Sequence, residues 1–259
     1  MSAVLLEGSI VHYEVLGRGR PVIFLHGWLG SWRYWISSMQ VASVSFRSYA
    51  LDLWGYGDTA QKPENYTIEK QAELIQRFLA EMGIGKVALV GHGLGALVGM
   101  KFAFENPSSV DRLMAIGCPI KSEAISPRLT TDTSTVLVDW LSNRTPESTS
   151  ALTDASKADS KAASVSINSF SPDLFSLFRT SNIPTLLVYG EKDLAITTPS
   201  EEDATSTLVH QLTLETSGHF PMLDEPIQFN RLVTDFLTLE SGASPRELEL
   251  KEEWKRRVR

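Results

Sequence analysis

A five-residue turn at positions 91–95, with the sequence GHGLG, directly follows the apolar run 87–90. An apolar strand, a glycine-bounded turn and a helix make up a nucleophile elbow, whose G-x-S-x-G motif places a serine for nucleophilic attack. Gly93 stands where that serine would be, and glycine has no side chain that could attack. The sequence therefore predicts the backbone of a nucleophile elbow without its nucleophile.

The conformation of this turn gives a physical reason for a glycine at position 93. The central residue of an elbow is held at positive φ, and such strain costs an ordinary residue about 1–3 kcal/mol. Glycine adopts the same conformation at little cost. We therefore expect the usual elbow geometry at Gly93, with a small void, large enough for one water molecule, in place of the serine side chain.

Two histidines and a carboxylate lie at the ends of other apolar runs. His26, Asp193 and His219 each lie close after a different run that is typical of a strand. Sheets of parallel strands bind ligands at the carboxyl ends of the strands, and the order elbow, acid, histidine is that of a Ser…Asp…His site. A carboxylate on one imidazole nitrogen fixes the tautomer and leaves the other nitrogen to accept a proton. The sequence predicts a His219–Asp193 dyad facing Gly93, with Glu191 as a rival for the acid.

These motifs resemble the α/β-hydrolase fold superfamily, of the small esterase, lipase and C–C hydrolase type, over residues 8–240. The resemblance implies that His219 is the catalytic histidine and that Asp193 is its carboxylate partner. It also implies an oxyanion hole formed by the backbone N–H groups of Trp28 and Leu94, which would stabilise developing negative charge.

Other residues near the same strand ends are expected to line the pocket. His26 and Gly27 belong to the loop that carries one oxyanion donor, and we expect His26 to organise this loop rather than act as a base. His92 is expected to pack beside the elbow. Trp54 lies in the segment 52–57, which resembles the superfamily's largely structural D-x-x-G-x-G loop. The tryptophans of these loops favour an apolar, aromatic-lined pocket for a small apolar substrate.

Apolar spacing predicts the elements that position these groups. Strands are expected at 4–16 (as two strands), 22–25, 49–51, 87–90, 113–116, 185–189 and 209–215. Helices are expected at 32–41, 67–82, 94–104 and about 226–239. Thr67 and Gly83 suit the two ends of the second helix. Because strands alternate with helices, we expect an α/β-hydrolase fold, with a mostly parallel, eight-stranded sheet flanked by helices.

The same pattern divides the chain into three parts. Residues 1–120 and 183–240 are expected to form the α/β-hydrolase core. Residues 121–182, rich in Ser, Thr, Ala and Asp, are too long for an ordinary connection and predict an inserted cap or lid. Residues 241–259 form a charged C-terminal tail, expected either as a solvated or frayed end or as a docking segment for a protein partner.

Composition excludes several classes of function. The net charge of −7 argues against nucleic acid or an anionic membrane as the main partner. Cys118 is the only cysteine, which excludes an intrachain disulfide and a thiolate metal cluster, and we expect neither a metal nor a cofactor. No stretch approaches 18 apolar residues, and the N-terminus lacks the basic region of a signal peptide. We therefore expect no membrane span and a cytoplasmic location.

Three functions remain open from the sequence. The first is an enzyme in which the His219–Asp193 dyad acts as a general base, without a covalent intermediate, on a substrate or on a water near Gly93. The second is a pseudoenzyme that binds a small ligand or a protein partner. The third is an esterase-type hydrolase whose serine has been exchanged for glycine. We favour the first, because the dyad and the oxyanion loop look intact while the group that forms the acyl-enzyme is absent.

Two local alternatives have weaker support. Gly91, Gly93 and Ala96 match the dinucleotide fingerprint G-x-G-x-x-A, but the next predicted strand does not end in the acidic residue that this motif requires. Cys118 ends a predicted strand and could serve as a surrogate nucleophile, although lone cysteines are mostly buried and inert.

Overall fold

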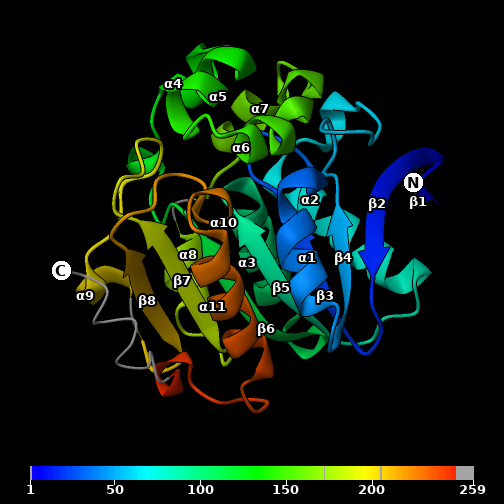
Figure 1. The fold of residues 1–259 in the computed structure, drawn as a ribbon. Coiled ribbons are helices and arrows are strands. Elements are labelled where there is room, and N and C mark those ends of the chain that lie inside the picture. Colours follow the sequence, from blue (N-terminus) through cyan, green and yellow to red (C-terminus); the bar gives the residue numbers. More distant parts are fainter. Residues whose placement is uncertain (1, 172, 205, 249–259) are drawn as a thin grey trace.

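A central β-sheet lies between two layers of helices, as Figure 1 shows. The computed structural model describes residues 2–171, 173–204 and 206–248. The strands of these residues form one sheet in the order β1-β2-β4-β3-β5-β6-β7-β8. Their bounds are β1 Ser2–Leu6, β2 Ser9–Leu16, β3 Arg20–Leu25, β4 Phe46–Leu51, β5 Val87–His92, β6 Val110–Ile116, β7 Thr185–Gly190 and β8 Val209–Leu214.

Most neighbouring strands in the sheet are parallel. β1 pairs with β2, and β2 with β4, in antiparallel register, whereas β4, β3, β5, β6, β7 and β8 pair in parallel. Every residue of β5 and of β7 is buried, as expected for strands covered on both faces. The prediction of a mostly parallel, eight-stranded sheet flanked by helices is confirmed.

β6 starts at Val110, three residues before the predicted start. Because Asp111 and Arg112 are polar, a search for apolar runs misses the start of this strand. Arg112 is 1% exposed, and its guanidinium donates to the backbone oxygen of Phe236 at 2.7 Å and to the carboxylate of Asp111 at 2.7 Å. A buried charge is tolerated here because it is fully paired.

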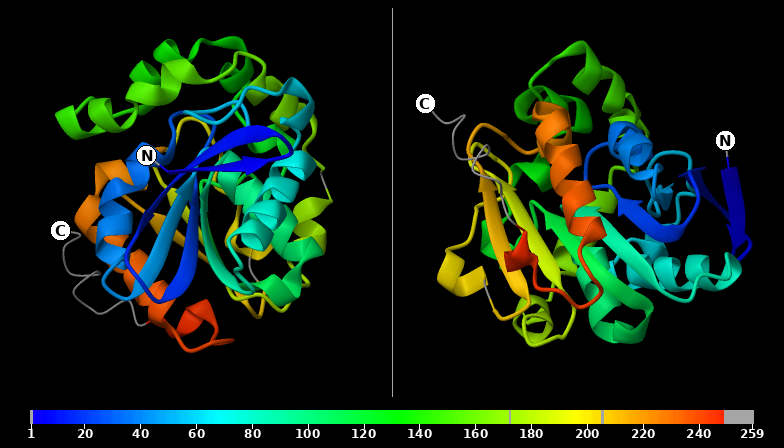
Figure 2. Two further views of the ribbon diagram at one scale, coloured as in Figure 1. Left: turned by 90° about the vertical axis from the view of Figure 1, so that its right-hand side faces the viewer. Right: turned by 60° about the horizontal axis from the view of Figure 1, so that its bottom comes forward.

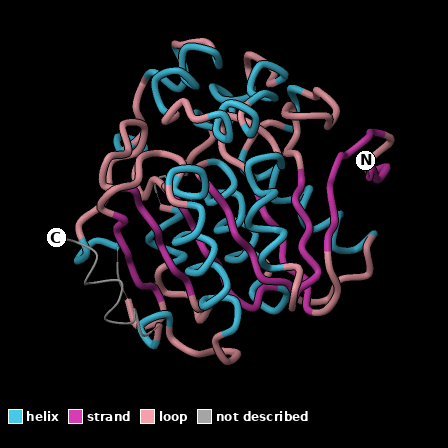
Figure 3. Tube along the Cα trace, in the orientation of Figure 1, coloured by secondary structure: helices cyan, strands magenta, loops and turns pink. Residues whose placement is uncertain are grey.

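Helices cover both faces of the sheet, as the coloured trace of Figure 3 shows. One face carries α1 and α11, and the other carries α2, α3 and α8 (Figure 2). The α-helices are α1 Ile36–Ala42, α2 Ile68–Glu81, α3 Leu94–Glu105, α4 Arg128–Thr131, α5 Ser134–Leu141, α6 Pro146–Ala151, α7 Ala162–Asn168, α8 Leu174–Phe178, α9 Glu201–Ala204, α10 Pro221–Asp224 and α11 Pro226–Thr238.

α2 illustrates how the sequence sets a helix. The side chain of Thr67 accepts a hydrogen bond from the N–H of Lys70, which caps the first turn. Gly83, at φ +64°, follows the last turn in the left-handed conformation that glycine adopts readily. The predicted helix with these two ends is confirmed.

The long segment between β6 and β7 lies in two places. α4 to α7 lie above the carboxyl ends of the strands, at the top of Figure 1, whereas α8 packs against α3 in the helix layer. Ion pairs join the 3-10 turn Thr153–Lys157, between α6 and α7, to the core: Asp154 accepts from Arg33 at 2.6 Å, and Lys157 contacts Asp58 at 2.8 Å. The division of the chain into a core and a cap of residues 121–182 stays a prediction.

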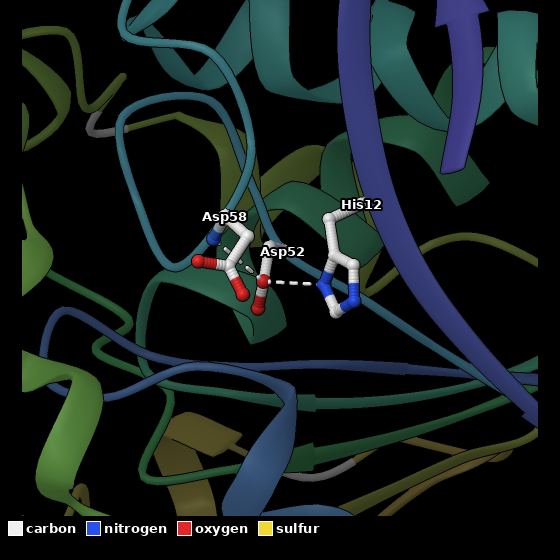
Figure 4. A group of neighbouring side chains, drawn as sticks. All are labelled: His12, Asp52 and Asp58. Atoms are coloured by element: carbon white, nitrogen blue, oxygen red, sulfur yellow. Dashed lines mark hydrogen bonds and ion pairs between the residues drawn. The ribbon is translucent and has the colours of Figure 1, made fainter. Parts of the chain in front are cut away.

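The turn after β4 is organised by one buried carboxylate, that of Asp52 (Figure 4). Oδ2 lies 2.7 Å from Nδ1 of His12 and accepts the N–H of Asp58 at 3.0 Å, and Oδ1 accepts the N–H of Trp32 at 2.8 Å. At Gly57, φ is +54°, and a Cβ built there would lie 2.1 Å from Asp52 Oδ2. The carboxylate therefore occupies the space that a side chain at position 57 would need.

None of the helices in the described ranges combines the length and the apolar character that crossing a bilayer requires. In the charged tail, Ser244 and Glu247 form a capping box at the start of the 3-10 turn Pro245–Glu247. The rest of that tail, 249–259, lies outside the described residues. The proposed docking role of the tail stays a prediction.

We predict that Gly57→Ala lowers the free energy of unfolding by more than about 3 kcal/mol, because backbone strain adds to the clash with Asp52. Gly83→Ala is the matched control: φ is also positive, but a Cβ there meets nothing within 4 Å, so about 1 kcal/mol is expected. Urea denaturation of the two variants measures the difference. Equal losses would contradict the packing argument.

Candidate functional site

The elbow joins the end of β5 to the start of α3. Gly93 has φ +51° and ψ −110°, the positive φ that the sequence predicts, and it is the N-cap of α3. The flanking glycines allow the turn to be tight: a Cβ at Gly91 would lie 2.4 Å from the oxygen of Gly95, and one at Gly95 would lie 2.4 Å from the oxygen of Leu25. Any side chain at either flank would force α3 away from β5 and β3.

The ring of Trp28 borders the space in which a void was expected at Gly93, and the void itself stays a prediction. A Cβ built on Gly93 would lie 3.1 Å from both Cε3 and Cζ3 of the indole. The indole is 2% exposed, and its Nε1–H donates to Oγ of Ser166, on α7, at 3.0 Å. A helix above the sheet therefore helps to hold the ring that packs on the elbow.

His219 and Asp193 form a hydrogen-bonded pair. Nδ1 of His219 lies 3.0 Å from each carboxylate oxygen of Asp193, and their side chains are 1% and 2% exposed. The N–H groups of Ala195 and Ile196 donate to Oδ1 at 2.7 and 3.1 Å. Nε2 of His219 makes no hydrogen bond with a described residue, so it is the nitrogen left to accept a proton. The rival acid, Glu191, is exposed.

The charge state of Asp193 follows from its surroundings. Burial by itself raises the pKa of this carboxyl, but the charge and hydrogen bond of His219 and the two backbone N–H groups outweigh burial and lower the pKa. Asp193 is therefore an anion at neutral pH, which favours the Nδ1–H tautomer of His219.

Close contact between the turns after β7 and β8 brings Asp193 and His219 together. A Cβ at Gly190, at the end of β7, would lie 2.1 Å from the backbone oxygen of Gly218, just after β8. The N–H of Gly218 in turn donates to Asp224, at the end of α10, at 2.8 Å. Burial raises the pKa of Asp224. These contacts fix the backbone on which His219 stands.

The loop after β3 is held by His26. Its Nδ1–H donates to the oxygen of Gly27 at 2.8 Å, and its Nε2 accepts the N–H of Leu53 at 3.0 Å. Burial lowers the pKa of His26, so that the ring is neutral and both nitrogens are occupied. This arrangement favours the organising role over a role as base.

Two backbone N–H groups remain available near the elbow. Leu94 is the first residue of α3, so its N–H has no partner within the helix. Across the described part of the chain, neither this N–H nor that of Trp28 donates to another residue. Both were predicted as oxyanion donors, and that role stays a prediction.

His92 directly precedes Gly93 in the turn 91–95 and is fully buried. Its Nε2 is 2.8 Å from the backbone oxygen of His219, and its Nδ1 is 3.1 Å from Oη of Tyr34. Burial lowers the pKa of His92 well below the ordinary range. Sequence reasoning missed Tyr34 and Ser166, because one reads as an ordinary helix residue and the other lies in a segment without a motif.

Two other candidates have no visible link to Gly93. Trp54 is buried, and its N–H and C=O are bonded to the side chain of Gln71, on α2, at 2.9 and 3.0 Å. Its place in the pocket stays a prediction. Burial raises the pKa of the Cys118 thiol to about 12, which argues against a surrogate nucleophile.

One group of side chains has the composition of a metal site. Ligand atoms of His12, Asp52 and Asp58 lie within 4.8 Å of one another (Figure 4). However, Asp52 already accepts three hydrogen bonds, one of them from His12. We assign these groups to the structure of the turn after β4, because Oδ2 of Asp52 binds both the ring of His12 and the backbone of Asp58.

An open depression of about 390 Å³ lies at the turn between β2 and β3, at the opposite end of the strands from the elbow. It is lined by Val15, Gly17, Arg18, Gly19 and Arg47. The groups at the elbow do not contribute to it.

The strand order and the site together define a class of protein. The alpha/beta hydrolase fold family matches residues 20–176, more than half of the chain, and the chain belongs to this family. Soluble epoxide hydrolase of Corynebacterium sp. (strain C12) is 30% identical over 112 residues, 43% of this chain and 39% of that protein. Epoxide hydrolase 3 of Siraitia grosvenorii is 36% identical over 111 residues, 42% of this chain and 35% of that protein. The matched segments thus span less than half of each relative.

Solved structures show the same fold over nearly the whole chain. A hydrolase from Pseudomonas aeruginosa PA01 has a TM-score of 0.80 at 18% identity and covers 92% of this chain and 98% of its own. An esterase from Exiguobacterium antarcticum has a TM-score of 0.79 at 19% identity, with 92% and 99% covered. A serine-to-glycine variant of an N-acyl homoserine lactonase, complexed with N-hexanoyl homoserine lactone, has a TM-score of 0.78 at 19% identity, with 91% and 96% covered.

The buried histidines predict how stability depends on pH. The folded-state pKa of His92 lies below its ordinary value of 6.5, so below that pH the unfolded chain binds more protons and stability is lost as the pH falls. His92→Gln removes this contribution. Between pH 7 and pH 5, the variant should lose about 1–2 kcal/mol less free energy of unfolding than the unmodified protein.

His12 is the control of opposite sign. Burial alone lowers its pKa, but the hydrogen bond and charge of Asp52 raise it, so its contribution is present at low pH and lost as the pH rises. His12→Gln should therefore steepen the loss of stability on acidification. Urea denaturation at several pH values measures both slopes, and parallel curves for all three proteins would contradict the assignment.

Proposed function

We propose that this chain is a hydrolase-like enzyme in which the His219–Asp193 dyad acts as a general base without a covalent intermediate. In this proposal Gly93 occupies the nucleophile position, and the substrate is small and apolar. The observation that carries the proposal is the buried dyad: Nδ1 of His219 is 3.0 Å from both oxygens of Asp193, and Nε2 has no partner among the described residues. A folded domain has no structural need for an unpaired base nitrogen beside an elbow.

The chemistry follows from these groups. Nε2 of His219 would take a proton from a water molecule as the water oxygen bonds to the electrophilic carbon of the substrate. The N–H groups of Trp28 and Leu94 would stabilise the negative charge that develops on the substrate oxygen. The protonated imidazole, stabilised by Asp193, would then return its proton to the leaving group. Every step proceeds without a side chain at position 93.

Several findings support a small apolar substrate. The ring that packs on Gly93 belongs to Trp28, and the rings of His92 and Phe220 lie 4.6 and 4.8 Å from that of His219, between ring centroids. The similar proteins named above include epoxide hydrolases and an esterase. A serine-to-glycine variant of an N-acyl homoserine lactonase with the same fold was complexed with an acyl lactone.

A second candidate is a pseudoenzyme that binds a ligand, and one observation favours it. The indole of Trp28 packs against Gly93, 3.1 Å from where a Cβ would stand, and so narrows the space for a reacting atom beside the elbow. The two candidates differ in whether His219 contributes to turnover, which the following experiment measures.

The test compares the unmodified protein with His219→Gln on a panel of p-nitrophenyl esters of short and aromatic acids. We expect slow turnover by the unmodified protein, and a reduction of kcat/KM by about 10²–10⁴ in the variant, since the general base is removed. Glu191→Gln, at the exposed carboxylate near the same strand end, is the control and should retain the activity. Equal rates for the unmodified protein and His219→Gln would contradict the enzyme and favour the binding protein.

Trp28 makes a second prediction about the same site. A serine Cβ at position 93 would lie 3.1 Å from the indole, so Gly93→Ser by itself should give little acylation. Gly93→Ser combined with Trp28→Phe provides space and should increase the burst of p-nitrophenol by about tenfold or more over Gly93→Ser. Trp28→Phe alone is the control without a nucleophile and should give no burst.

The outcomes of this comparison distinguish a site that lacks only its nucleophile from a site that is built for other chemistry. A large gain with Gly93→Ser alone would mean that the nucleophile was the only missing part and would contradict the role of Trp28. No burst in the double variant would mean that the site has been remade for chemistry other than acyl transfer.

A further inference from the structure

His92 contacts the turn that carries His219 and, through Tyr34, the loop after β3. The mechanism proposed above does not use it. Its Nε2 is 2.8 Å from the backbone oxygen of His219, and its Nδ1 is 3.1 Å from Oη of Tyr34. The same hydroxyl accepts a hydrogen bond from the N–H of Gly27, in the loop with the oxyanion donor. His92 and Tyr34 are both buried.

The partners fix the direction of each hydrogen bond. The backbone oxygen of His219 can only accept, so Nε2 of His92 carries the proton. Since burial lowers the pKa of His92 well below its ordinary range, the ring is neutral and its Nδ1 accepts. Tyr34 therefore donates to Nδ1 while its oxygen accepts from Gly27. The result is one continuous chain of donors that runs from Gly27 through Tyr34 and His92 to His219.

Packing leaves the chain little freedom to move. A Cβ added at Gly27 would lie 2.8 Å from Nδ1 of His92. The ring of His92 contacts those of Tyr34, His219 and Phe220, at centroid distances of 5.7, 4.6 and 5.4 Å. With both ring nitrogens occupied, His92 is not free to act as a base.

We propose that His92 and Tyr34 are positioning residues, which hold the backbone of His219 and the oxyanion loop at fixed places relative to Gly93. The proposal rests on the proposed function for its catalytic meaning, since positioning matters only if His219 acts as a base. The structural part of the proposal does not depend on catalysis. Tyr34 has no hydrogen bond to His219 among the described contacts, yet removal of its hydroxyl should disturb His219 through His92.

Tyr34→Phe is the sharpest test, because it removes only the hydroxyl between Gly27 and His92. We expect the low-field proton resonance of His219 Nδ1–H, in its bond to Asp193, to shift or broaden in the NMR spectrum. We also expect the amide of Gly27 to exchange with solvent about tenfold faster or more, since it loses its acceptor. Where turnover is measurable, kcat should fall by about 10–100-fold with little change in KM.

Tyr189→Phe is the matched control. Its hydroxyl is also buried and donates to a backbone oxygen, that of Cys118, at 2.7 Å, but it is not part of the chain through His92. This variant should lose comparable stability and leave the His219 resonance and Gly27 exchange unchanged. If Tyr34→Phe changes the His219 resonance no more than Tyr189→Phe does, the positioning role is overturned.

His92 itself supplies a rescue experiment. His92→Leu removes the donor to His219 and should change the Nδ1–H resonance, whereas His92→Gln keeps an N–H donor and should restore much of it. Equal spectra for the two variants would overturn the proposal. These readouts need no turnover. If the unmodified protein is inactive but the variants still disturb the His219 resonance, the proposed function is contradicted and the positioning role is supported.

Discussion

Backbone atoms of neighbouring turns approach one another at the carboxyl edge of the sheet more closely than any side chain would allow. A Cβ would lie 2.4 Å from backbone at Gly91 and at Gly95, and 2.1 Å from backbone at Gly190. These approaches set the distance between the elbow, the loop after β3 and the turn that carries His219. The positions of the polar groups follow from this constraint, since each of them stands on one of the turns.

Electrostatics then act on groups that the backbone has already placed. Asp193 is buried, yet its pKa is lowered, because His219 and two N–H groups compensate for the lost hydration. His26 and His92 are buried without a carboxylate partner, and their pKa values are lowered. Of the three histidines near the elbow, only His219 combines a carboxylate on one nitrogen with a second nitrogen that has no partner among the described residues.

The sequence predicts the architecture well because its signals are local. The apolar runs of β5 and β7, and the capped helix after Thr67, depend on neighbours in the chain, and the structure has them within two residues of the expected bounds. β4 starts at Phe46, three residues before its predicted start. β6 was predicted too short, because the pairing of Arg112 with the oxygen of Phe236 joins residues more than a hundred positions apart. Polar residues within a strand interrupt the apolar pattern that predicts it, and only the folded structure reveals the distant groups that pair with them.

The sequence predicts the individual polar residues of the site, but not the aromatic rings that pack around them. The order of Gly93, Asp193 and His219 can be found in the sequence, and the structure brings the last two within hydrogen-bond distance. The position of the Trp28 ring cannot be found there, because it depends on Ser166, in a segment without a motif. The same holds for Tyr34, whose spacing is that of an ordinary helix residue.

The hydrogen bond between Trp28 and Ser166 has a kinetic consequence. The indole packs against Gly93 and its Nε1–H donates to Ser166 on α7, so a ligand atom that takes the place of the ring must first break this hydrogen bond. The association rate of such a ligand is then limited by how often the ring and α7 separate, not by diffusion to the surface. At high ligand concentration, such a binding rate reaches a plateau equal to the opening rate of the site.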